Sequence, residues 1–403
     1  MKSRSFLLKH LLLLGTLAFL TQSCADKSDE VESYFGFNLP KATIDRHIEE
    51  QMAQLGMPGL SFALINDGQV VHHNTFGYAN LETQTKVSNN TIFEAASLSK
   101  PMFAYFAMTF VDEGILDLDT PLYTYQPHPD IEYDERYKQI TARMVLCHRS
   151  GFPNWRNDTP GDKLKIHFDP GTDFLYSGEG YMYLGKVLCH LKNTDWEGLE
   201  VEYQSRVASP LGMEHTVFIQ DSFSMKHKAE PYDEDGQWIS PDRDPERQYR
   251  FEFRPPASVH SEAIDFSKWL IALMNKKGLK ESSFDELFRV HSYVNEFNSI
   301  KVDYTLGFYK PRIPLTNLYL HGGNNYGFTS FFAADPDSDW GFVLFTNSEY
   351  GEQLGNELLL YLFFGPNLTI LYILLGVLAL SIIAFLFFGI RFFIRVLRRK
   401  KGA

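Results

Sequence analysis

Apolar residues recur with two different spacings along the main body of the chain. Between residues 43 and 55, Ile44, Ile48 and Met52 fall at helical spacing, which predicts an amphipathic helix. Apolar runs at 59–65 and 69–76 flank the turn sequence Asn-Asp-Gly, a pattern typical of a β-hairpin. The same reasoning predicts three later strands and a closing helix, at 317–321, 329–334, 340–347 and 353–363.

This order of elements indicates an α/β (α+β) fold, in which an antiparallel sheet is flanked by helices and an all-helical subdomain is inserted in the middle. Residues 41–364 are numerous enough for two domains, but they contain no Gly/Ser linker, low-complexity run or internal repeat. Residues 221–256 are acidic and rich in aromatic side chains. They are either an insertion that borders a cleft or a solvated irregular loop.

The first 23 residues have the pattern of a secretory signal, with three basic residues before a short apolar core at 11–20. The following sequence Thr-Gln-Ser-Cys resembles a bacterial lipoprotein cleavage box, so we expect Cys24 to carry a lipid. The alternative is ordinary signal cleavage with Cys24 unmodified. Residues 24–40 begin with an acidic, polar spacer and are expected to form a flexible lead-in.

The other end of the chain predicts a single transmembrane helix. Residues 368–390 include no charged side chain and would span about 34 Å as a helix, enough to cross a bilayer with some tilt. Six basic residues follow within the tail 391–403. By the positive-inside rule this tail is expected to be cytoplasmic, which places the main domain on the extracytoplasmic side of the cell membrane, periplasmic or extracellular.

Charge and cysteine content limit the partners. Of the 38 Lys and Arg residues, three precede residue 24 and six follow residue 365, which leaves 29 against all 50 acidic residues. A charge of about −21 on the main domain disfavours nucleic acid and is ordinary for an extracytoplasmic enzyme. Cys147 and Cys189 lie in apolar stretches, so we expect buried free thiols rather than a disulfide. Neither has the ligand spacing of a zinc site.

Residues 97–100, with the sequence Ser-Leu-Ser-Lys, carry the most informative chemistry. The apolar residues around them, 91–103, suit the start of a buried helix. Positions i and i+3 share a helix face, so Lys100 is expected to reach the Ser97 hydroxyl. A serine hydroxyl needs an adjacent base to become a good nucleophile, and a lysine deprived of water can serve once its pKa is depressed.

Two segments further along add to this pair. In 174–181, Tyr176 lies on a glycine-punctuated turn and can act as a phenolate-type base or as a proton shuttle. In 320–328, a strand is expected to end at His321 and two glycines, which let a substrate backbone approach closely.

With these three motifs in this order, the chain resembles the serine β-lactamase and penicillin-binding-protein superfamily, in its class-C-like branch of esterases and D-amino-acid peptidases. The likeness extends over about residues 41–362, through further recurrent blocks at 111–122, 146–152, 210–213 and 261–269. It implies a sheet domain and a helical subdomain with the site in the cleft between them. It also implies that no cofactor and no metal are required.

Two departures from the family pattern bear on the substrate. The second motif ends in Gly178 where many members have Asn, and the third opens with His321 where β-lactamases have Lys. Both changes occur among relatives that act as esterases or D-amino-acid peptidases, and they count against efficient β-lactam hydrolysis. Because imidazole titrates near neutral pH, we expect His321 to gain charge below about pH 6.5 and to orient Tyr176 or bind a substrate carboxylate.

The resemblance implies covalent acyl transfer, with Ser97 as nucleophile and Lys100 and Tyr176 moving the proton. The Ser97 backbone N–H and a second one near Gly323 or Asn324 would stabilise the oxyanion; Ser99, Ser177 and His148 are expected to be structural. We therefore expect a membrane-anchored, extracytoplasmic serine hydrolase that acts on an ester or on a D-amino-acid amide or peptide, either a small molecule or a peptidoglycan-type substrate. The alternatives are a β-lactamase and a catalytically silent cell-wall binder.

Overall fold

The computed structural model describes residues 29–158, 163–240, 242, 251–297 and 300–366, with isolated positions at 376, 380, 381 and 385. The predicted signal segment, Cys24 and the basic tail lie outside these residues, as does most of the predicted spanning segment 368–390. Within the described ranges, no helix is both long enough and apolar enough to cross a membrane.

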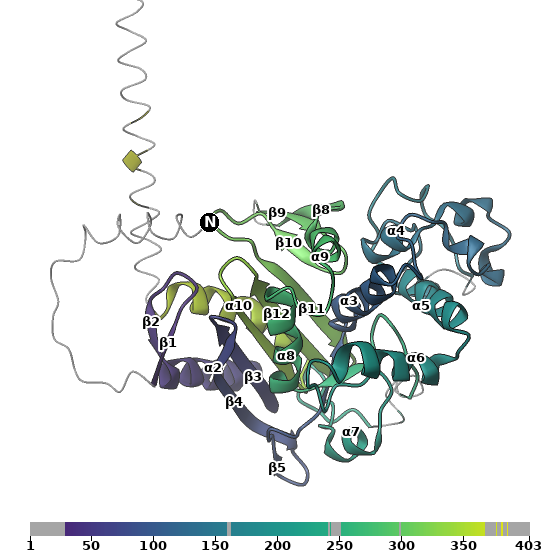
Figure 1. Cartoon of the computed structure of the whole chain (residues 1–403). Coiled ribbons are helices and arrows are strands. Elements are labelled where there is room, and N and C mark those ends of the chain that lie inside the picture. Colours follow the sequence, from purple (N-terminus) through teal and green to yellow (C-terminus); the bar gives the residue numbers. More distant parts are fainter. Residues whose placement is uncertain are drawn as a thin grey trace, which may run out of the picture.

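A nine-stranded antiparallel sheet forms the centre of the part of the chain that the structure describes (Figure 1). Its strand order is β5-β4-β3-β13-β12-β11-β10-β9-β8, so that strands from the two ends of the chain meet in the middle, where β3 pairs with β13. The strands are β3 (Gly59–Asn66), β4 (Gln69–Asn80), β5 (Thr85–Lys86), β8 (Ser292–Phe297), β9 (Ile300–Tyr304), β10 (Tyr309–Pro311), β11 (Tyr319–Asn325), β12 (Phe328–Asp335) and β13 (Trp340–Thr346).

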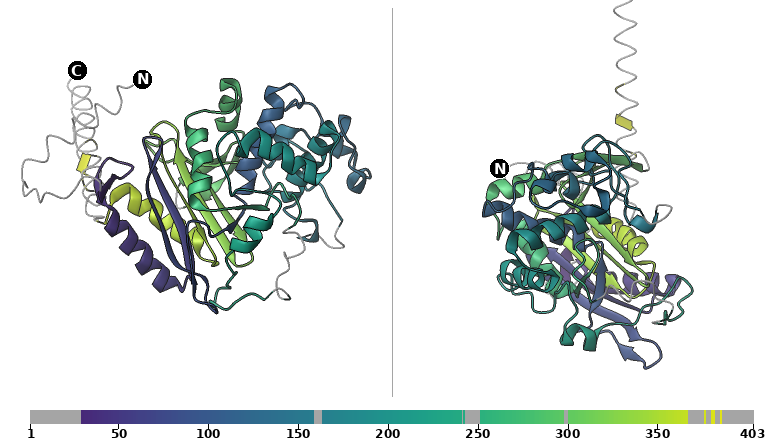
Figure 2. Two further views of the ribbon diagram at one scale, coloured as in Figure 1. Left: turned by 60° about the horizontal axis from the view of Figure 1, so that its bottom comes forward. Right: turned by 90° about the vertical axis from the view of Figure 1, so that its right-hand side faces the viewer.

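Helices cover both faces of this sheet because its central strands are apolar on both sides. Along β12, Phe331 and Ala333 pack toward α10 (Gly351–Phe364), whereas Phe332 belongs to the core cluster on the opposite face. The first face is covered by α10 together with α2 (Lys41–Leu55), and α8 (Ala263–Met274) packs on the second, as Figure 2 shows.

The central part of the chain forms the helical subdomain beside the sheet (Figure 1). Its long helix α3 (Ser99–Asp112) is buried along almost its whole length and is therefore apolar all round. The other helices are α4 (Ala142–Leu146), α5 (Gly178–Lys192), α6 (Trp196–Tyr203) with a π-helical turn over Gln204–Ala208, α7 (Ser222–His227) and α9 (Glu281–Phe288). Short 3₁₀ turns lie at Leu122–Thr124, Pro129–Ile131, Glu135–Gln139 and Arg156–Asp158.

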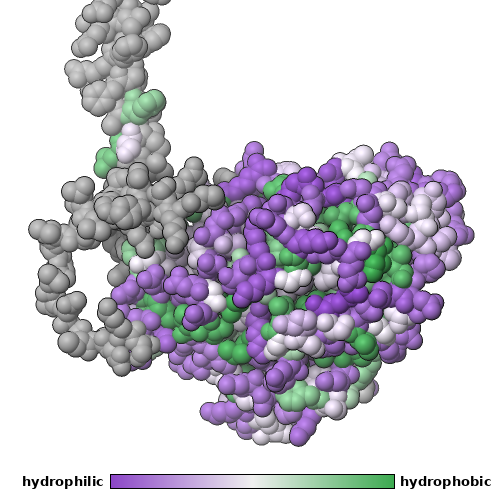
Figure 3. All heavy atoms as spheres, in the orientation of Figure 1, coloured by the Kyte–Doolittle hydropathy of each residue, from purple (hydrophilic) through white to green (hydrophobic). Residues whose placement is uncertain are grey.

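Hydrophilic residues cover most of the face shown in Figure 3, and hydrophobic residues emerge mainly in the hollows between elements. The two cysteines within the described residues, Cys147 and Cys189, are buried free thiols, as the sequence predicts.

Two expectations need correction, and one edge of the sheet was not predicted. The lead-in is ordered from residue 29, because β1 (Glu30–Glu32) pairs with β2 (Asn38–Pro40) and the intervening Tyr34 stacks on Phe363 of α10. β11 does not end at the glycines, since it stays paired with β12 up to Asn325. The strands β8, β9 and β10 were not predicted at all. They form one edge of the sheet, where alternation of polar and apolar residues is weak.

The helix α10 offers a test of how tightly the sheet is covered. A Cβ atom added at Gly355 would lie 2.4 Å from Cγ of Phe331, which is too close for two carbon atoms. Gly355→Ala should therefore destabilise the protein by about 1–3 kcal/mol through overpacking, although alanine in a helix normally gains about 1 kcal/mol over glycine. Urea unfolding measures the change, with Gln353→Ala on the exposed side of α10 as control. A more stable Gly355→Ala variant would contradict this packing.

Candidate active site

Ser97 lies in a two-residue turn between a short strand and the buried helix α3. The strand β6 (Phe93–Ala96) pairs with β7 (Val259–Ser261), so residues 93–96 are extended rather than the helix start that we expected. Ala96 has a φ of 49°, a left-handed conformation that non-glycine residues adopt rarely and that is often found at functional sites. The Ser99 hydroxyl secures the turn by donating to the Ala96 carbonyl at 2.6 Å.

Lys100, in the first turn of α3, faces Ser97 as the spacing predicts. Its Nζ lies 3.1 Å from the Ser97 Oγ and donates to the Pro256 carbonyl at 3.0 Å. The side chain is only 1% exposed. Burial, and to a smaller extent the charge of Arg254, hold the pKa of Lys100 well below its usual range. A neutral amine next to a serine hydroxyl can accept its proton.

Tyr176 precedes α5 and lies against the same amine, with its ring centroid 4.4 Å from Lys100 Nζ. Burial raises the pKa of Tyr176 far above its usual value, and the neighbouring Tyr309 adds to the shift, while a hydrogen bond with Ser97 opposes it. Tyr176 is therefore a neutral phenol. Of the two roles predicted for it, the structure favours the proton shuttle over the phenolate base.

His321 differs most from its prediction. It is 1% exposed, and burial, followed by the charge of Lys100, lowers its pKa to about 3. Its Nδ1 lies 2.6 Å from the Gly322 carbonyl and its Nε2 lies 3.2 Å from the Tyr304 hydroxyl. The expectation that His321 gains charge below about pH 6.5 is wrong, because the ring is shut off from water and both nitrogens are occupied. A neutral imidazole is also a poor partner for a carboxylate.

The strand β11 brings its backbone against the turn that carries Ser97. A Cβ atom added at Gly323 would lie 2.5 Å from the Ala95 carbonyl oxygen and 3.0 Å from the Ser97 nitrogen. β10 pairs with β11 only at Leu320, so from His321 onward no strand within the described residues is hydrogen-bonded to the other edge of β11. Successive N–H groups of a strand point to opposite edges, and every second one therefore faces this open side.

The two remaining predicted positions are Gly178 and Asn324. Gly178 is buried, its N–H donates to Asn154, and an added Cβ would lie 3.0 Å from the Trp155 ring. The indole thus fills the space into which an asparagine side chain would project. The Asn324 amide donates one hydrogen bond to Glu349, at 3.0 Å, and this side chain is exposed.

Several residues around the site were missed by the sequence reasoning. Tyr304 and Tyr309 come from the unpredicted strands β9 and β10, and Arg254 stacks over Trp155 at 4.5 Å. Glu94, three residues before Ser97, is almost fully buried and binds Lys228 and the Asn325 amide. A signal existed for His148, which lies in a recurrent block of the family but was interpreted as structural. Arg254 lies in the segment 221–256, one interpretation of which was an insertion that borders the cleft.

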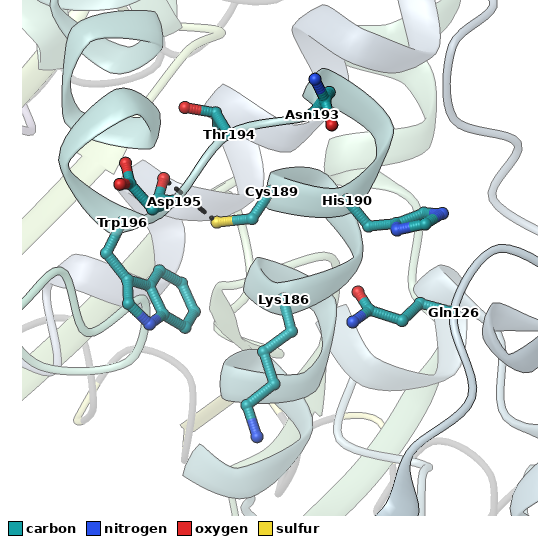
Figure 4. A pocket seen from close by; sticks show the side chains of 8 residues that line it. All are labelled: Gln126, Lys186, Cys189, His190, Asn193, Thr194, Asp195 and Trp196. Atoms are coloured by element: carbon teal, nitrogen blue, oxygen red, sulfur yellow. Dashed lines mark hydrogen bonds between the residues drawn. The ribbon is translucent and has the colours of Figure 1, made fainter.

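A pocket lies away from these residues, where the end of α5 meets the start of α6 (Figure 4). Burial raises the pKa of its cysteine, Cys189, to about 12, and the thiol donates to the Asp195 carbonyl, so it is a poor nucleophile. None of the residues that line it takes part in the arrangement around Ser97; they are Gln126, Lys186, Cys189, His190, Asn193, Thr194, Asp195 and Trp196. Within the described residues no group of His, Cys, Asp and Glu could hold a metal ion.

Solved structures share this fold. The chain superposes with a TM-score of 0.68 on the octameric penicillin-binding protein homologue from Pyrococcus abyssi, at 22% identity over 81% of this chain and 78% of that one. It superposes with a TM-score of 0.67 on the D-alanine carboxypeptidase AmpC from Burkholderia cenocepacia, at 18% identity over 81% and 99%. A class C β-lactamase follows at 0.66, with 19% identity over 81% and 96%.

Sequence comparison agrees with the fold. The chain is 26% identical over 338 residues to Protein flp of Staphylococcus aureus, covering 78% of this chain and 65% of the length of that protein. The sequence model of the family described as Beta-lactamase matches residues 44–363, which is most of the chain. The chain therefore belongs to the Beta-lactamase family of serine hydrolases.

Proposed function

We propose that this protein hydrolyses an ester or a D-amino-acid amide or peptide through a covalent acyl-enzyme on Ser97. The observation that carries the proposal is the 3.1 Å separation of Ser97 Oγ and Lys100 Nζ, with the lysine buried. Burial disfavours the charged ammonium, so a lysine removed from water is more readily available as a base than an exposed one. A catalytically silent relative would have no use for this costly arrangement.

In the acylation step, the Ser97 Oγ attacks the substrate carbonyl carbon while Lys100 Nζ accepts the hydroxyl proton. The carbonyl oxygen takes up the electron pair of its π bond and becomes an oxyanion. When this intermediate collapses, the bond to the leaving group breaks, and the neutral phenol of Tyr176 protonates the departing oxygen or nitrogen. Tyr176 then regains a proton from the Lys100 ammonium.

Deacylation runs through the same groups in reverse. A water molecule attacks the acyl carbon and passes a proton to the neutral Lys100. The bond from the acyl carbon to Oγ then breaks, and the proton returns to Ser97. One group thus acts as base and then as acid, which requires a pKa near the working pH rather than the usual value for lysine.

The oxyanion is stabilised by the backbone N–H of Ser97 and by one from β11, contributed by Gly323 or Asn324. Both belong to rigid elements, a turn held by Ser99 and a strand held by β12. Donors that are already oriented need no reorganisation as charge develops, and each can contribute several kcal/mol, roughly 2.7–4.

The substrate class follows from what occupies the positions that differ from β-lactamases. His321 is neutral, and Trp155 fills the space beside Gly178. Neither position offers a permanent cation or an amide to the carboxylate and amide groups of a β-lactam. Arg254, which lies over Trp155, is a permanent cation whose charge reaches Lys100, and it does not by itself distinguish a D-amino-acid peptide from a β-lactam, since both carry a carboxylate.

The proposed location is the outer face of the cell membrane. It rests on the apolar segment 368–390, the basic tail and the possible lipid on Cys24, all read from the sequence. In such a location the domain would meet peptidoglycan-type substrates as well as small molecules.

Removing the Ser97 hydroxyl should abolish covalent labelling. Ser97→Ala should form no adduct with a fluorophosphonate and should lose turnover by about three or more orders of magnitude, because the nucleophile and its base act as a unit. Intact mass and peptide mapping give the result, with Ser205→Ala, an exposed serine of the helical subdomain, as control. An adduct that persists in Ser97→Ala or maps to Ser99 would refute the assignment.

Adding one methyl group to β11 should separate the two oxyanion donors. In Gly323→Ala the new Cβ would overlap the backbone of Ala95 and Ser97, so β11 must move away, and kcat should fall by about a hundredfold or more. Gly322→Ala is the matched control, since its Cβ would meet only the exposed side chain of Glu352, which can rotate away. Equal kcat values in the two variants would show that the close approach at Gly323 is not needed for catalysis.

Esters and D-alanyl amides should be turned over faster than nitrocefin. A missing charged hydrogen bond costs about 1.5–3 kcal/mol, so kcat/KM for the best p-nitrophenyl ester or D-alanyl amide should exceed that for nitrocefin by about tenfold to a hundredfold. The panel should include Ser97→Ala to subtract background hydrolysis. Nitrocefin turnover equal to that of the best ester would restore the β-lactamase alternative.

A further inference from the structure

Four hydrogen bonds join the two walls of the active site through buried side chains. On the helical side, the Ser177 N–H donates to His148 Nδ1 at 3.0 Å, directly after Tyr176 in the sequence. The other nitrogen, His148 Nε2, lies 3.1 Å from the Tyr304 hydroxyl. This hydroxyl lies 3.2 Å from His321 Nε2, and His321 Nδ1 lies 2.6 Å from the Gly322 carbonyl on β11.

The two ends of this chain of hydrogen bonds fix its direction independently. A backbone N–H can only donate, so His148 Nδ1 is unprotonated and the proton of this neutral ring is on Nε2, from which it donates to Tyr304. A backbone carbonyl can only accept, so His321 carries its proton on Nδ1 and accepts at Nε2. Only the Tyr304 hydroxyl can satisfy both inner nitrogens, because it accepts from one ring and donates to the other.

Both histidines are kept neutral, as this pattern requires. His148 and Tyr304 are fully buried, and burial followed by the charge of Lys100 holds the pKa of His148 well below its usual range. Burial also raises the pKa of Tyr304, so its hydroxyl keeps the proton that it donates. A phenol with a proton is the one group at this position that can both accept and donate.

This hydrogen-bond chain lies directly behind Tyr176, which moves the proton. The ring centroids of His148 and Tyr176 are 4.4 Å apart, and those of Tyr176 and His321 are 6.2 Å apart. Its two ends are the residue that follows Tyr176 and the residue that precedes Gly323. The distance between the Tyr176 hydroxyl and the oxyanion strand therefore depends on this connection.

We propose that Tyr304 and His148 are positioning residues, which together with His321 form a one-directional hydrogen-bond chain that sets the place of Tyr176 relative to β11. The role of His321 is then to end this chain at Gly322, and substrate does not contact its ring. This inference rests on the acyl-transfer function proposed above, in which Tyr176 delivers the leaving-group proton and β11 supplies an oxyanion donor.

The test compares two tyrosines that differ only in where their hydroxyls point. Tyr304→Phe keeps the ring and removes the hydroxyl that joins the two histidines. Tyr183→Phe is the matched control, because Tyr183 is also buried and its hydroxyl donates to a single backbone carbonyl, that of Gln126. Tyr304→Phe should lower kcat by about tenfold to a hundredfold, since small misplacements of reacting groups cost this much, and KM should change little. Tyr183→Phe should leave both unchanged.

The titration of His321 gives a readout that lost packing alone would not move. Without the Tyr304 hydroxyl, His321 Nε2 loses the donor that favours its neutral form, so the pKa of His321 should rise, which an NMR titration of its ring signals measures. The titratable groups that face this hydrogen-bond chain are Lys100 from α3, Tyr181 from α5, Tyr309 from β10 and Tyr176 before α5. The charge of Glu352 on α10 adds to the raised pKa of Tyr176 and of Tyr309. His148 instead loses the acceptor of its Nε2–H, which disfavours its charged form, so a rise in pKa is expected for His321 alone.

A second variant protects the test against misfolding. His148→Asn retains an acceptor for the Ser177 N–H but is too short to reach Tyr304, so it should reproduce the loss of kcat. Thermal melting of each variant separates loss of fold from loss of activity.

A folded Tyr304→Phe variant that still labels at Ser97, with wild-type kcat and an unchanged His321 titration, would overturn the positioning role and leave the acyl-enzyme intact. Absence of labelling in the wild-type protein would instead refute the proposed function itself.

Discussion

The exclusion of water from Lys100 is the constraint on which the site depends. An amine in water is protonated at ordinary pH and cannot act as a base, and burial of the charged form is costly. Here the helix α3, which is buried almost throughout, keeps the amine away from water. Two contacts to the amine offset part of this cost: the hydrogen bond to the Pro256 carbonyl and the face of the Tyr176 ring. The tight packing of α3 therefore determines the chemistry of Ser97 as well as the stability of the subdomain.

The second constraint is the close approach of two backbones. One oxyanion donor lies in the turn directly after β6 and the other on β11. These two strands are not hydrogen-bonded neighbours in one sheet, so other contacts must hold them together. Gly323 permits the approach because it has no side chain, and the Ser330 hydroxyl donates to the Ala95 carbonyl across it. The buried Glu94 adds a bond from β6 to Asn325 at the end of β11. These contacts preorganise the site before substrate binds.

The rings around the site are uncharged, and this affects substrate choice as well as catalysis. His148, His321, Tyr176 and Tyr304 are all held in their neutral forms by burial, which leaves hydrogen bonds rather than ionic contacts to orient them. Hydrogen bonds between neutral groups are directional, so such a network gives orientation without attracting anions. A substrate is then selected by shape and by its fit to the oxyanion donors.

The sequence by itself determined the family, the hairpin of β3 and β4, the helices α2 and α10 on one face of the sheet, and the pairing of Ser97 with Lys100. These features depend on local periodicity and on a spacing of three residues. The tertiary structure alone decided the charge of His321 and Tyr176, since desolvation depends on residues distant in the chain. It also brought Tyr304 and His148 together, 156 residues apart, from segments with no pattern that links them. Secondary structure depends mainly on neighbouring residues. The pKa values of buried groups depend on desolvation, which residues distant in the sequence produce when they pack around the site.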